Sequence, residues 1–212
     1  MIQVETLVFN DFQVNTYVLF DETKECIIID PGCSNETEQK KLDLLIELKG
    51  LKPVGMYNTH LHIDHIFGNE YVLHKYKLSF SIHPEGIHFL NTAIGYASVF
   101  GFNFQSVPKP EGYLHEKDVI HFGNSKLDVI ETPGHAEGSF CFVCKPQKFV
   151  IVGDVLFSGS IGRTDLPSGD IDTLLNSIRT KLFTLGDDYL VYCGHGPTTT
   201  IGEERVYNPF LN

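Results

Sequence analysis

Residues 59–65 read Thr-His-Leu-His-Ile-Asp-His, so three imidazoles and one carboxylate fall within a single short run. Three further residues of ligand type follow at well-separated positions: His135, Asp154 and His195. Imidazole nitrogens and carboxylate oxygens suit zinc, and iron or manganese also accept this set. Two adjacent metal ions allow a hydrolase to use a hydroxide nucleophile at neutral pH. We therefore expect a hydrolase with two divalent metal ions, Zn2+ being the first choice.

The spacing of these residues suggests how they divide between two ions. His60 and His62 have the same parity, so an extended segment directs both imidazoles to one side, where His135 completes three nitrogens. The second ion then has three ligands of its own, namely Asp64, His65 and His195. We expect Asp154 to bridge the two ions, and the shared hydroxide to occupy the open position.

The alternative interpretation is that these histidines are ordinary polar residues. The chain has 10 histidines, and five of them would then cluster by accident. We expect ordinary roles only for the histidines that lack such neighbours, which are His74, His83, His88, His115 and His121.

Each candidate ligand lies in a turn just after an apolar run typical of a β-strand. The four runs that precede ligands are residues 54–57, 127–131, 149–152 and 190–193. Further strands are predicted at residues 2–9, 15–20, 26–29, 78–82 and 140–144. Helices are predicted from Asn35 to Gly50 and over residues 172–183. Turns after strands converge at one edge of a sheet, which is a usual place for sites in layered α/β proteins.

Composition limits the class of protein. A chain of 212 residues with 42% hydrophobic residues fits one domain over residues 1–212 with a sizeable core. The formal net charge of −11 disfavours nucleic acid as a partner. No secretory signal or membrane-length apolar stretch is visible, so we expect a cytoplasmic protein without a membrane partner.

The chain has five cysteines, an odd number, and they are scattered. We therefore expect reduced thiols. Cys141 and Cys144 spell C-x-x-C, but within a predicted strand, where residues three apart point to opposite faces. Core packing is favoured there over redox chemistry.

The motif at residues 59–65, the three later ligands and the Asp30-Pro31-Gly32 turn together resemble the metallo-β-lactamase superfamily over nearly the whole chain. Within that superfamily, residues 153–157, 162–167 and 193–202 are similar to the glyoxalase II group, especially its short bacterial members without the C-terminal helical domain. The resemblance implies an α/β (α+β) fold, a four-layer αββα sandwich. It also implies a dinuclear site formed by the same seven ligands.

The resemblance further implies hydrolysis of a small-molecule thioester, as in hydroxyacylglutathione hydrolases. In the mechanism that this resemblance implies, a bridging hydroxide would attack the thioester carbonyl, and one ion would polarise the carbonyl oxygen. Asp154 and Asp64 are the carboxylates expected to take part in catalysis, Asp64 as a proton relay. The acyl group, the thiol carrier and the oligomeric state do not follow from the sequence.

Three other features have two interpretations each. Asp30 either orients a ligand imidazole or caps its own turn. Arg163 either contacts a substrate carboxylate or pairs internally with Asp165 or Asp170. Residues 91–109 form either a mobile aromatic segment that covers the metal mouth or a helix that packs on the core.

The sequence is also compatible with other functions. Close relatives include mononuclear iron persulfide dioxygenases, which keep the same histidines, and hydrolases of another ester, lactone or thioester are also compatible. β-Lactam hydrolysis is less favoured, because many such enzymes have a cysteine where this chain has Asp154. An RNA-processing nuclease lacks support because the chain is acidic. A nonenzymatic role requires a site that binds no metal.

Overall fold

The computed structural model of the protein describes residues 1–102, 104 and 106–212. The chain divides into two compact units. Unit 1 consists of Met1–Leu114 and His121–Lys126, and unit 2 consists of His115–Ile120 and Leu127–Asn212. The expectation of a single domain over residues 1–212 stays a prediction.

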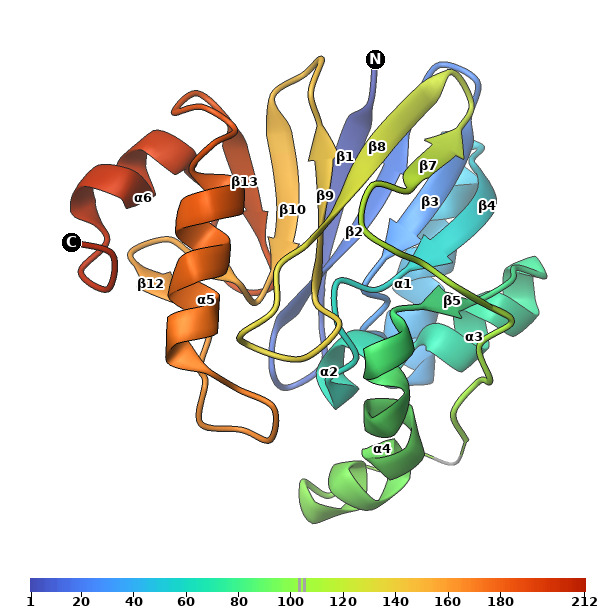
Figure 1. Ribbon diagram of the computed structural model, residues 1–212. Helices are drawn as coiled ribbons and strands as arrows, with labels where there is room; N and C mark the ends of the chain where they lie inside the picture. Colours follow the sequence, from blue (N-terminus) through green and yellow to red (C-terminus); the bar gives the residue numbers. More distant parts are fainter. Residues whose placement is uncertain (103, 105) are drawn as a thin grey trace. The chain divides into compact units, whose positions relative to one another are not determined.

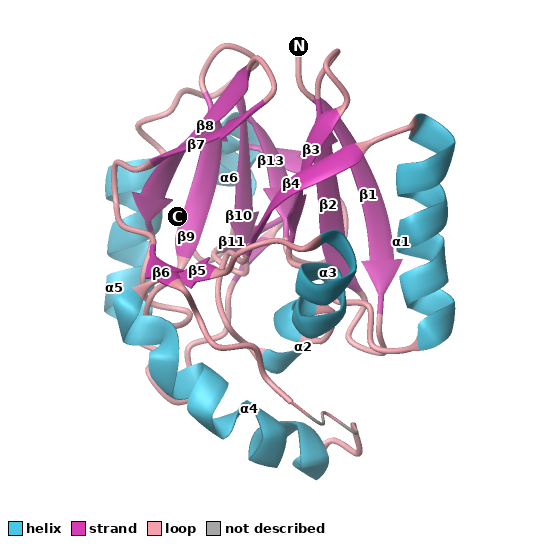
Figure 2. Cartoon of the chain, turned by 90° about the vertical axis from the view of Figure 1, so that its right-hand side faces the viewer, coloured by secondary structure: helices cyan, strands magenta, loops and turns pink. Residues whose placement is uncertain are grey.

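Unit 1 is built on a four-stranded sheet in the order β1-β2-β3-β4. The strands are β1 (Gln3–Phe9), β2 (Val14–Phe20), β3 (Glu25–Ile29) and β4 (Lys52–Tyr57). The first three are antiparallel, whereas β3 and β4 are parallel because helix α1 (Glu36–Lys49) connects them as a crossover. Figure 2 shows α1 beside this sheet.

Helix α1 has the boundaries that its end residues predict. The side chain of Asn35 accepts a hydrogen bond from the amide of Glu38, and Gly50 ends the helix in the left-handed conformation at φ 63°. Leu42 and Ile46 are buried and belong to the core of unit 1, together with apolar residues of the sheet such as Val18.

The remaining elements of unit 1 follow β4 in the chain, and the first of them carries part of the predicted metal motif. They are α2 (Ile63–Ile66), α3 (Asn69–Tyr76), β5 (Ser81–Ile82), η1 (Pro84–Gly86), α4 (Ile87–Val99) and β6 (Gly112–Tyr113). The strand predicted at residues 78–82 is wrong for its first half. The amide of Leu78 donates to the carbonyl of Leu73, so that residue closes the end of α3.

Unit 2 contains most of a six-stranded sheet in the order β14-β13-β10-β9-β8-β7. The strands are β7 (Val119–Phe122), β8 (Ser125–Glu131), β9 (Phe140–Cys144), β10 (Phe149–Gly153), β13 (Leu190–Cys193) and β14 (Thr199–Thr200). Strands β10 and β13 are parallel, and β8, β9 and β10 are antiparallel neighbours. Strands β11 (Leu156–Phe157) and β12 (Ser160–Ile161) form a separate hairpin.

The predicted helix over residues 172–183 is present in a modified form. It consists of α5 (Ile171–Ser177) followed by η2 (Ile178–Leu182), a turn of π-helix. Leu174, Ile178 and Leu182 are fully buried and belong to the core of unit 2, as their helical spacing predicts. Figure 1 shows α5 in orange near β10 and β13, with α6 (Ile201–Tyr207) in red.

All five cysteines are described, all are buried, and none forms a disulfide, which confirms the prediction of reduced thiols. Cys141 and Cys144 lie on β9, whose five residues are all buried. Burial raises the pKa of Cys141 to about 12, so this thiol stays protonated at neutral pH and packs in the core. Among the described residues, no helix combines the length and apolarity needed to cross a membrane.

Candidate metal centre

The motif at residues 59–65 brings its donor groups together within unit 1. His60 and His62 lie in the loop after β4, whereas Asp64 and His65 lie on the short helix α2. Nε2 of His60 is 3.1 Å from Nδ1 of His62, and the ring centroids of His60 and His65 are 4.1 Å apart. Nε2 of His65 is 3.5 Å from Oδ2 of Asp64. The four side chains predicted as ligands therefore form one group.

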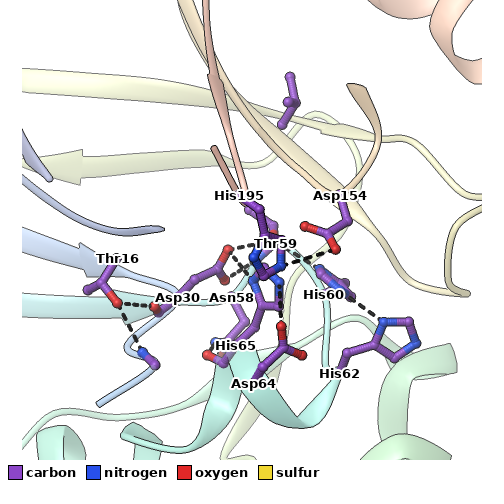
Figure 3. A network of polar contacts seen from close by, with 12 residues as sticks. Thr16, Asp30, Asn58, Thr59, His60, His62, Asp64, His65, Asp154 and His195 are labelled. Atoms are coloured by element: carbon purple, nitrogen blue, oxygen red, sulfur yellow. Dashed lines mark hydrogen bonds and ion pairs between the residues drawn. The ribbon is translucent and has the colours of Figure 1, made fainter. Parts of the chain in front are cut away.

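Asp30 connects this group to the end of β3. Its Oδ1 accepts a hydrogen bond of 2.7 Å from the amide of Thr59, and its Oδ2 accepts one of 2.6 Å from the Thr59 hydroxyl. The same Oδ2 lies 3.0 Å from Nδ1 of His65 (Figure 3). A carboxylate on one ring nitrogen leaves the other nitrogen for a metal, an arrangement found around many ligand imidazoles. Asp30 thus orients a predicted ligand, which decides between its two interpretations.

Thr59 extends the influence of Asp30 to a second imidazole. The threonine hydroxyl has one hydrogen, and it donates that hydrogen to Asp30. The contact of 3.1 Å between the same oxygen and Nδ1 of His60 must then be donated by the imidazole. His60 therefore carries its proton on Nδ1, and Nε2 is the nitrogen with a lone pair for a metal.

Two asparagines that the sequence reasoning missed hold helix α2 in place. The side-chain amide of Asn10 donates to the carbonyl of Asp64 at 3.0 Å, and that of Asn58 donates to the carbonyl of His65 at 2.9 Å. These carbonyls belong to a helix of only four residues, so the two asparagine side chains tie this short helix to the segments around it. The sequence offered a signal only for Asn58, which directly precedes the motif.

The other three predicted ligands lie together in unit 2, each after a strand as expected. Oδ2 of Asp154 is 3.7 Å from Nε2 of His135 and 3.5 Å from Nε2 of His195. Nδ1 of His135 is 2.8 Å from the backbone carbonyl of Arg163, so it donates to that oxygen and keeps Nε2 for a metal. Asp154 lies between the two imidazoles, as a bridging carboxylate requires.

The side chain of Arg163 has an internal partner. Its Nε and Nη2 atoms donate to the two carboxylate oxygens of Asp165 at 2.7 and 2.8 Å. These hydrogen bonds lower the pKa of Asp165 to about 2. Asp170 caps helix α5 through the amide of Thr173. The internal pair with Asp165 is therefore present, and contact between Arg163 and a substrate stays a prediction.

The segment 91–109 begins as a helix. Leu90, Ala93 and Ala97 of α4 are buried in the core of unit 1, which favours the packing interpretation for residues 91–99. Phe89 of this helix contacts the ring of His62 edge to face at 5.2 Å. Residues 103 and 105 of the predicted segment lie outside the described residues.

The donor set fits divalent metal ions. All seven residues offer an imidazole nitrogen or a carboxylate oxygen, and none offers a thiolate. Three of the imidazoles, those of His60, His65 and His135, have an oxygen partner at Nδ1. Zinc, iron and manganese accept this chemistry.

Comparisons with known proteins agree with this geometry. The family model described as the metallo-beta-lactamase superfamily matches residues 9–195. The chain belongs to the metallo-beta-lactamase superfamily. Proteins with the fold of this superfamily bind divalent metals, and the curated relatives of the chain include metallo-hydrolases. A metal-dependent hydrolase is therefore supported.

Two curated relatives are similar to this chain over nearly their whole length. A probable metallo-hydrolase, YqgX, of Bacillus subtilis (strain 168) is 39% identical over 94% of this chain and 93% of the relative. The hydroxyacylglutathione hydrolase GloC of Haemophilus influenzae (strain ATCC 51907 / DSM 11121 / KW20 / Rd) is 35% identical over 99% of this chain and 98% of the relative.

Solved structures confirm the predicted metallo-β-lactamase fold. The crystal structure of BLEG-1 B3 metallo-beta-lactamase has a TM-score of 0.90 and 33% identity, over 99% of this chain and 100% of that chain. The structure of TTHA1623 in a di-iron-bound form has a TM-score of 0.87 and 33% identity, over 98% of this chain and 100% of that chain. Iron is therefore a metal that at least one similar structure holds.

Proposed function

We propose that this protein is a metal-dependent thioesterase of the hydroxyacylglutathione hydrolase type. The proposal rests on one combined observation. A chain that is 35% identical to a hydroxyacylglutathione hydrolase over nearly its full length also has seven imidazole and carboxylate donors. The net charge of −11 supports a small-molecule thioester, rather than a nucleic acid, as the substrate.

We propose that the seven residues hold two divalent ions, with zinc as the first choice and iron as the alternative. His60, His62 and His135 would hold one ion, and Asp154 would bridge. The other ion would have Asp64, His65 and His195 as its own ligands. When bound, such ions supply Lewis acidity, which lowers the pKa of water and polarises a carbonyl oxygen.

The residues of the chain contribute orientation and proton transfer. Asp30 holds His65 through Nδ1 and, through Thr59, fixes the protonated nitrogen of His60. The carbonyl of Arg163 does the same for His135. Asp64 is partly exposed, with 13% of its side chain accessible, and carries a carboxylate beside His65. It is the group that we propose as a proton relay for the leaving thiolate.

Arg163 is the proposed contact for a carboxylate on the thiol carrier. Its pair with Asp165 is solvent-exposed, since 61% and 68% of the two side chains are accessible. Exposed pairs of this kind contribute little free energy, because water screens the two charges. A substrate carboxylate can therefore compete with Asp165 for the guanidinium group.

A second candidate function is β-lactam hydrolysis. It is favoured by one observation, the 33% sequence identity to a structure described as a B3 metallo-beta-lactamase. The third alternative, iron-dependent oxidation of a persulfide, uses the same histidines. The three functions differ in substrate and in oxygen consumption, so one set of assays separates them.

The deciding experiment is thiol release from lactoylglutathione by zinc-replete and by iron-replete protein. Asp154→Ala is the test variant, and His74→Ala, an exposed histidine on α3, is the control. We expect turnover and two equivalents of metal in wild type and His74→Ala, and loss of both in Asp154→Ala. Removal of metal with a chelator abolishes the activity, and added metal restores it.

Three results would contradict the proposal. Full thioester hydrolysis by Asp154→Ala would remove the two-metal scheme. Turnover of a chromogenic β-lactam without thiol release would select the second candidate. Oxygen uptake by iron-replete protein with glutathione persulfide, again without thioester hydrolysis, would select the dioxygenase.

A further inference from the structure

Residues 162–170, which we call the strap, connect the β11–β12 hairpin to helix α5. The strap contributes none of the seven proposed metal ligands. It nevertheless contacts the segments around two of them, His135 and Asp154, and all of these contacts lie within unit 2.

One end of the strap touches both ligands. The carbonyl of Arg163 accepts the hydrogen bond from Nδ1 of His135. Immediately before it, Gly162 lies against the backbone of Asp154. A Cβ atom at Gly162 would be 1.9 Å from the carbonyl oxygen of Asp154 and 3.1 Å from Cβ of His135. Real Cβ atoms essentially never approach other atoms closer than 3.0 Å, so any side chain here forces the backbone to move.

The other end of the strap is attached to the turn that carries His135. The hydroxyl of Ser168 accepts a hydrogen bond of 3.2 Å from the amide of Glu137. The amide of Asp170 donates to the carbonyl of Gly134 at 2.8 Å. The strap is thus bound to the His135 turn at three points, on both sides of the ligand. Asp170 also caps α5, whose Leu174 is buried in the core.

These contacts have a consequence for the two ligands. A metal site requires ligand distances within about 0.2 Å of their ideal values. His135 and Asp154 are 19 positions apart on different turns, and Nε2 of the former lies 3.7 Å from Oδ2 of the latter. Apart from the Ser168 hydroxyl, the strap contacts both turns through its backbone atoms, which have less freedom than side chains.

We propose that the strap is a positioning element. Gly162 sets the distance between His135 and Asp154, because only a residue without a side chain lets the strap lie directly against the backbone of Asp154. This inference rests on the proposed metal ligands, but not on the identity of the substrate. The strap acts through the carbonyl of Arg163, so the Arg163 side chain stays available for another role.

The test variant is Gly162→Ala, and its matched control is Gly159→Ala. Gly159 lies in the same hairpin and has a φ of 71°, but a Cβ atom there meets nothing within 4 Å. The control therefore introduces backbone strain without touching the ligands. Affinity for Zn2+ is measured by competition with a chelating dye on metal-free protein, and folding is measured separately by urea denaturation.

We expect Gly162→Ala to lower the affinity for Zn2+ at least tenfold, the lower limit for loss of an orienting contact. Gly159→Ala should keep wild-type affinity even if it unfolds at lower urea. Cobalt-substituted protein gives a second reading, because visible absorption of Co2+ depends on ligand number and geometry. Its spectrum should change in Gly162→Ala and not in Gly159→Ala.

A milder variant keeps the test decisive if Gly162→Ala does not fold. Ser168→Ala removes one of the three attachments and adds no atoms, so we expect a measurable loss of affinity that stays below the roughly tenfold loss expected for Gly162→Ala. Wild-type affinity and an unchanged cobalt spectrum in the folded Gly162→Ala protein, or in Ser168→Ala if the first is unfolded, would overturn the proposal.

The metal-binding measurements test the strap separately from the thioesterase assay. Metal binding by wild type without thioester hydrolysis would refute the proposed substrate and leave the strap inference standing. Failure of wild type to bind Zn2+, Co2+ or Fe2+ would refute both.

Discussion

The carboxylate of Asp30 and the imidazole of His65 are 35 positions apart in the chain, yet Oδ2 of Asp30 lies 3.0 Å from Nδ1 of His65. Both side chains are fully buried, with 1% of the Asp30 side chain and 0% of the His65 side chain accessible. The pair joins the end of β3 to helix α2, and it fixes which nitrogen of His65 faces away from Asp30.

We expect Asp30→Asn to lower the affinity for metal about 10- to 100-fold. An asparagine amide in place of the accepting oxygen would meet the N–H of His65 or the hydroxyl of Thr59 as a second donor. Asp11→Asn, at an exposed position, makes the same change in charge and should bind metal normally. Equal affinity in the two variants, measured by dye competition, would show that the contact between Asp30 and His65 does not influence metal binding.

Thr59 provides a separate test of the hydrogen-bond chain from Asp30 to His60. Thr59→Ser keeps the hydroxyl and should retain most of the metal affinity. Thr59→Val keeps the shape but has no acceptor for Nδ1 of His60, so we expect about tenfold weaker binding. Similar metal contents in the two purified proteins would contradict this role for the hydroxyl.

Arg163 offers a test of substrate recognition. Arg163→Ala keeps the backbone carbonyl that accepts from His135, so the metal content should not change. Loss of the solvent-screened pair with Asp165 should leave the midpoint of urea denaturation nearly unchanged. For a thioester with a carboxylate on its thiol carrier we expect KM to rise with little change in kcat. An equal rise in KM for an uncharged thioester would argue against contact with a carboxylate.

Asp43 of α1 connects that helix to α3. Its two oxygens accept hydrogen bonds from Tyr71 at 2.5 Å and Tyr76 at 2.6 Å. Burial, followed by the hydrogen bond to Asp43, raises the pKa of Tyr76 above its usual range. Tyr76→Phe should lower the free energy of unfolding by about 2 kcal/mol, as for hydrogen bonds to charged groups. Urea denaturation measures this change, and Tyr207→Phe, at a residue that is 77% exposed, should differ from wild type by less than about 0.5 kcal/mol.

Asp21 should make the stability depend on pH in acid. Burial by itself raises the pKa of this carboxyl, but hydrogen bonds from Thr23, Asn124 and Ser125 outweigh it and hold the pKa at about 2, against 3.8 for the ordinary group. A lowered pKa stabilises the fold above pH 3.8, and this contribution, on the order of 2 kcal/mol, is lost as the pH falls toward 2.

The variant Asp21→Asn cannot titrate at this position. We expect it to be less stable than wild type at pH 6 and to lose less stability between pH 4 and pH 2. Urea denaturation at several pH values measures both slopes, and Asp11→Asn serves as the charge control. Parallel curves for wild type and Asp21→Asn would contradict the assignment.

Much of the local structure could be predicted from the sequence because it depends on neighbouring residues. Asn35 and Gly50 mark the ends of α1, and the alternation and apolar runs predict the main strands. The prediction was wrong at residues 78–80, where the turn after α3 uses the residues of an apparent strand. The sequence does not predict helix α4 uniquely, because apolar residues of that spacing fit either a packed helix or an aromatic cover.

The sequence by itself determined which residues are candidate ligands and that they follow strands, since imidazoles and carboxylates at strand ends are a local pattern. Only the tertiary structure decided which groups orient them. Asn10, Asp30 and Gly162 contact ligand segments that are distant in the chain, and no periodicity connects them. The reason is physical: hydrogen-bond geometry and close backbone approach depend on positions in space, which the packing of strands and helices sets.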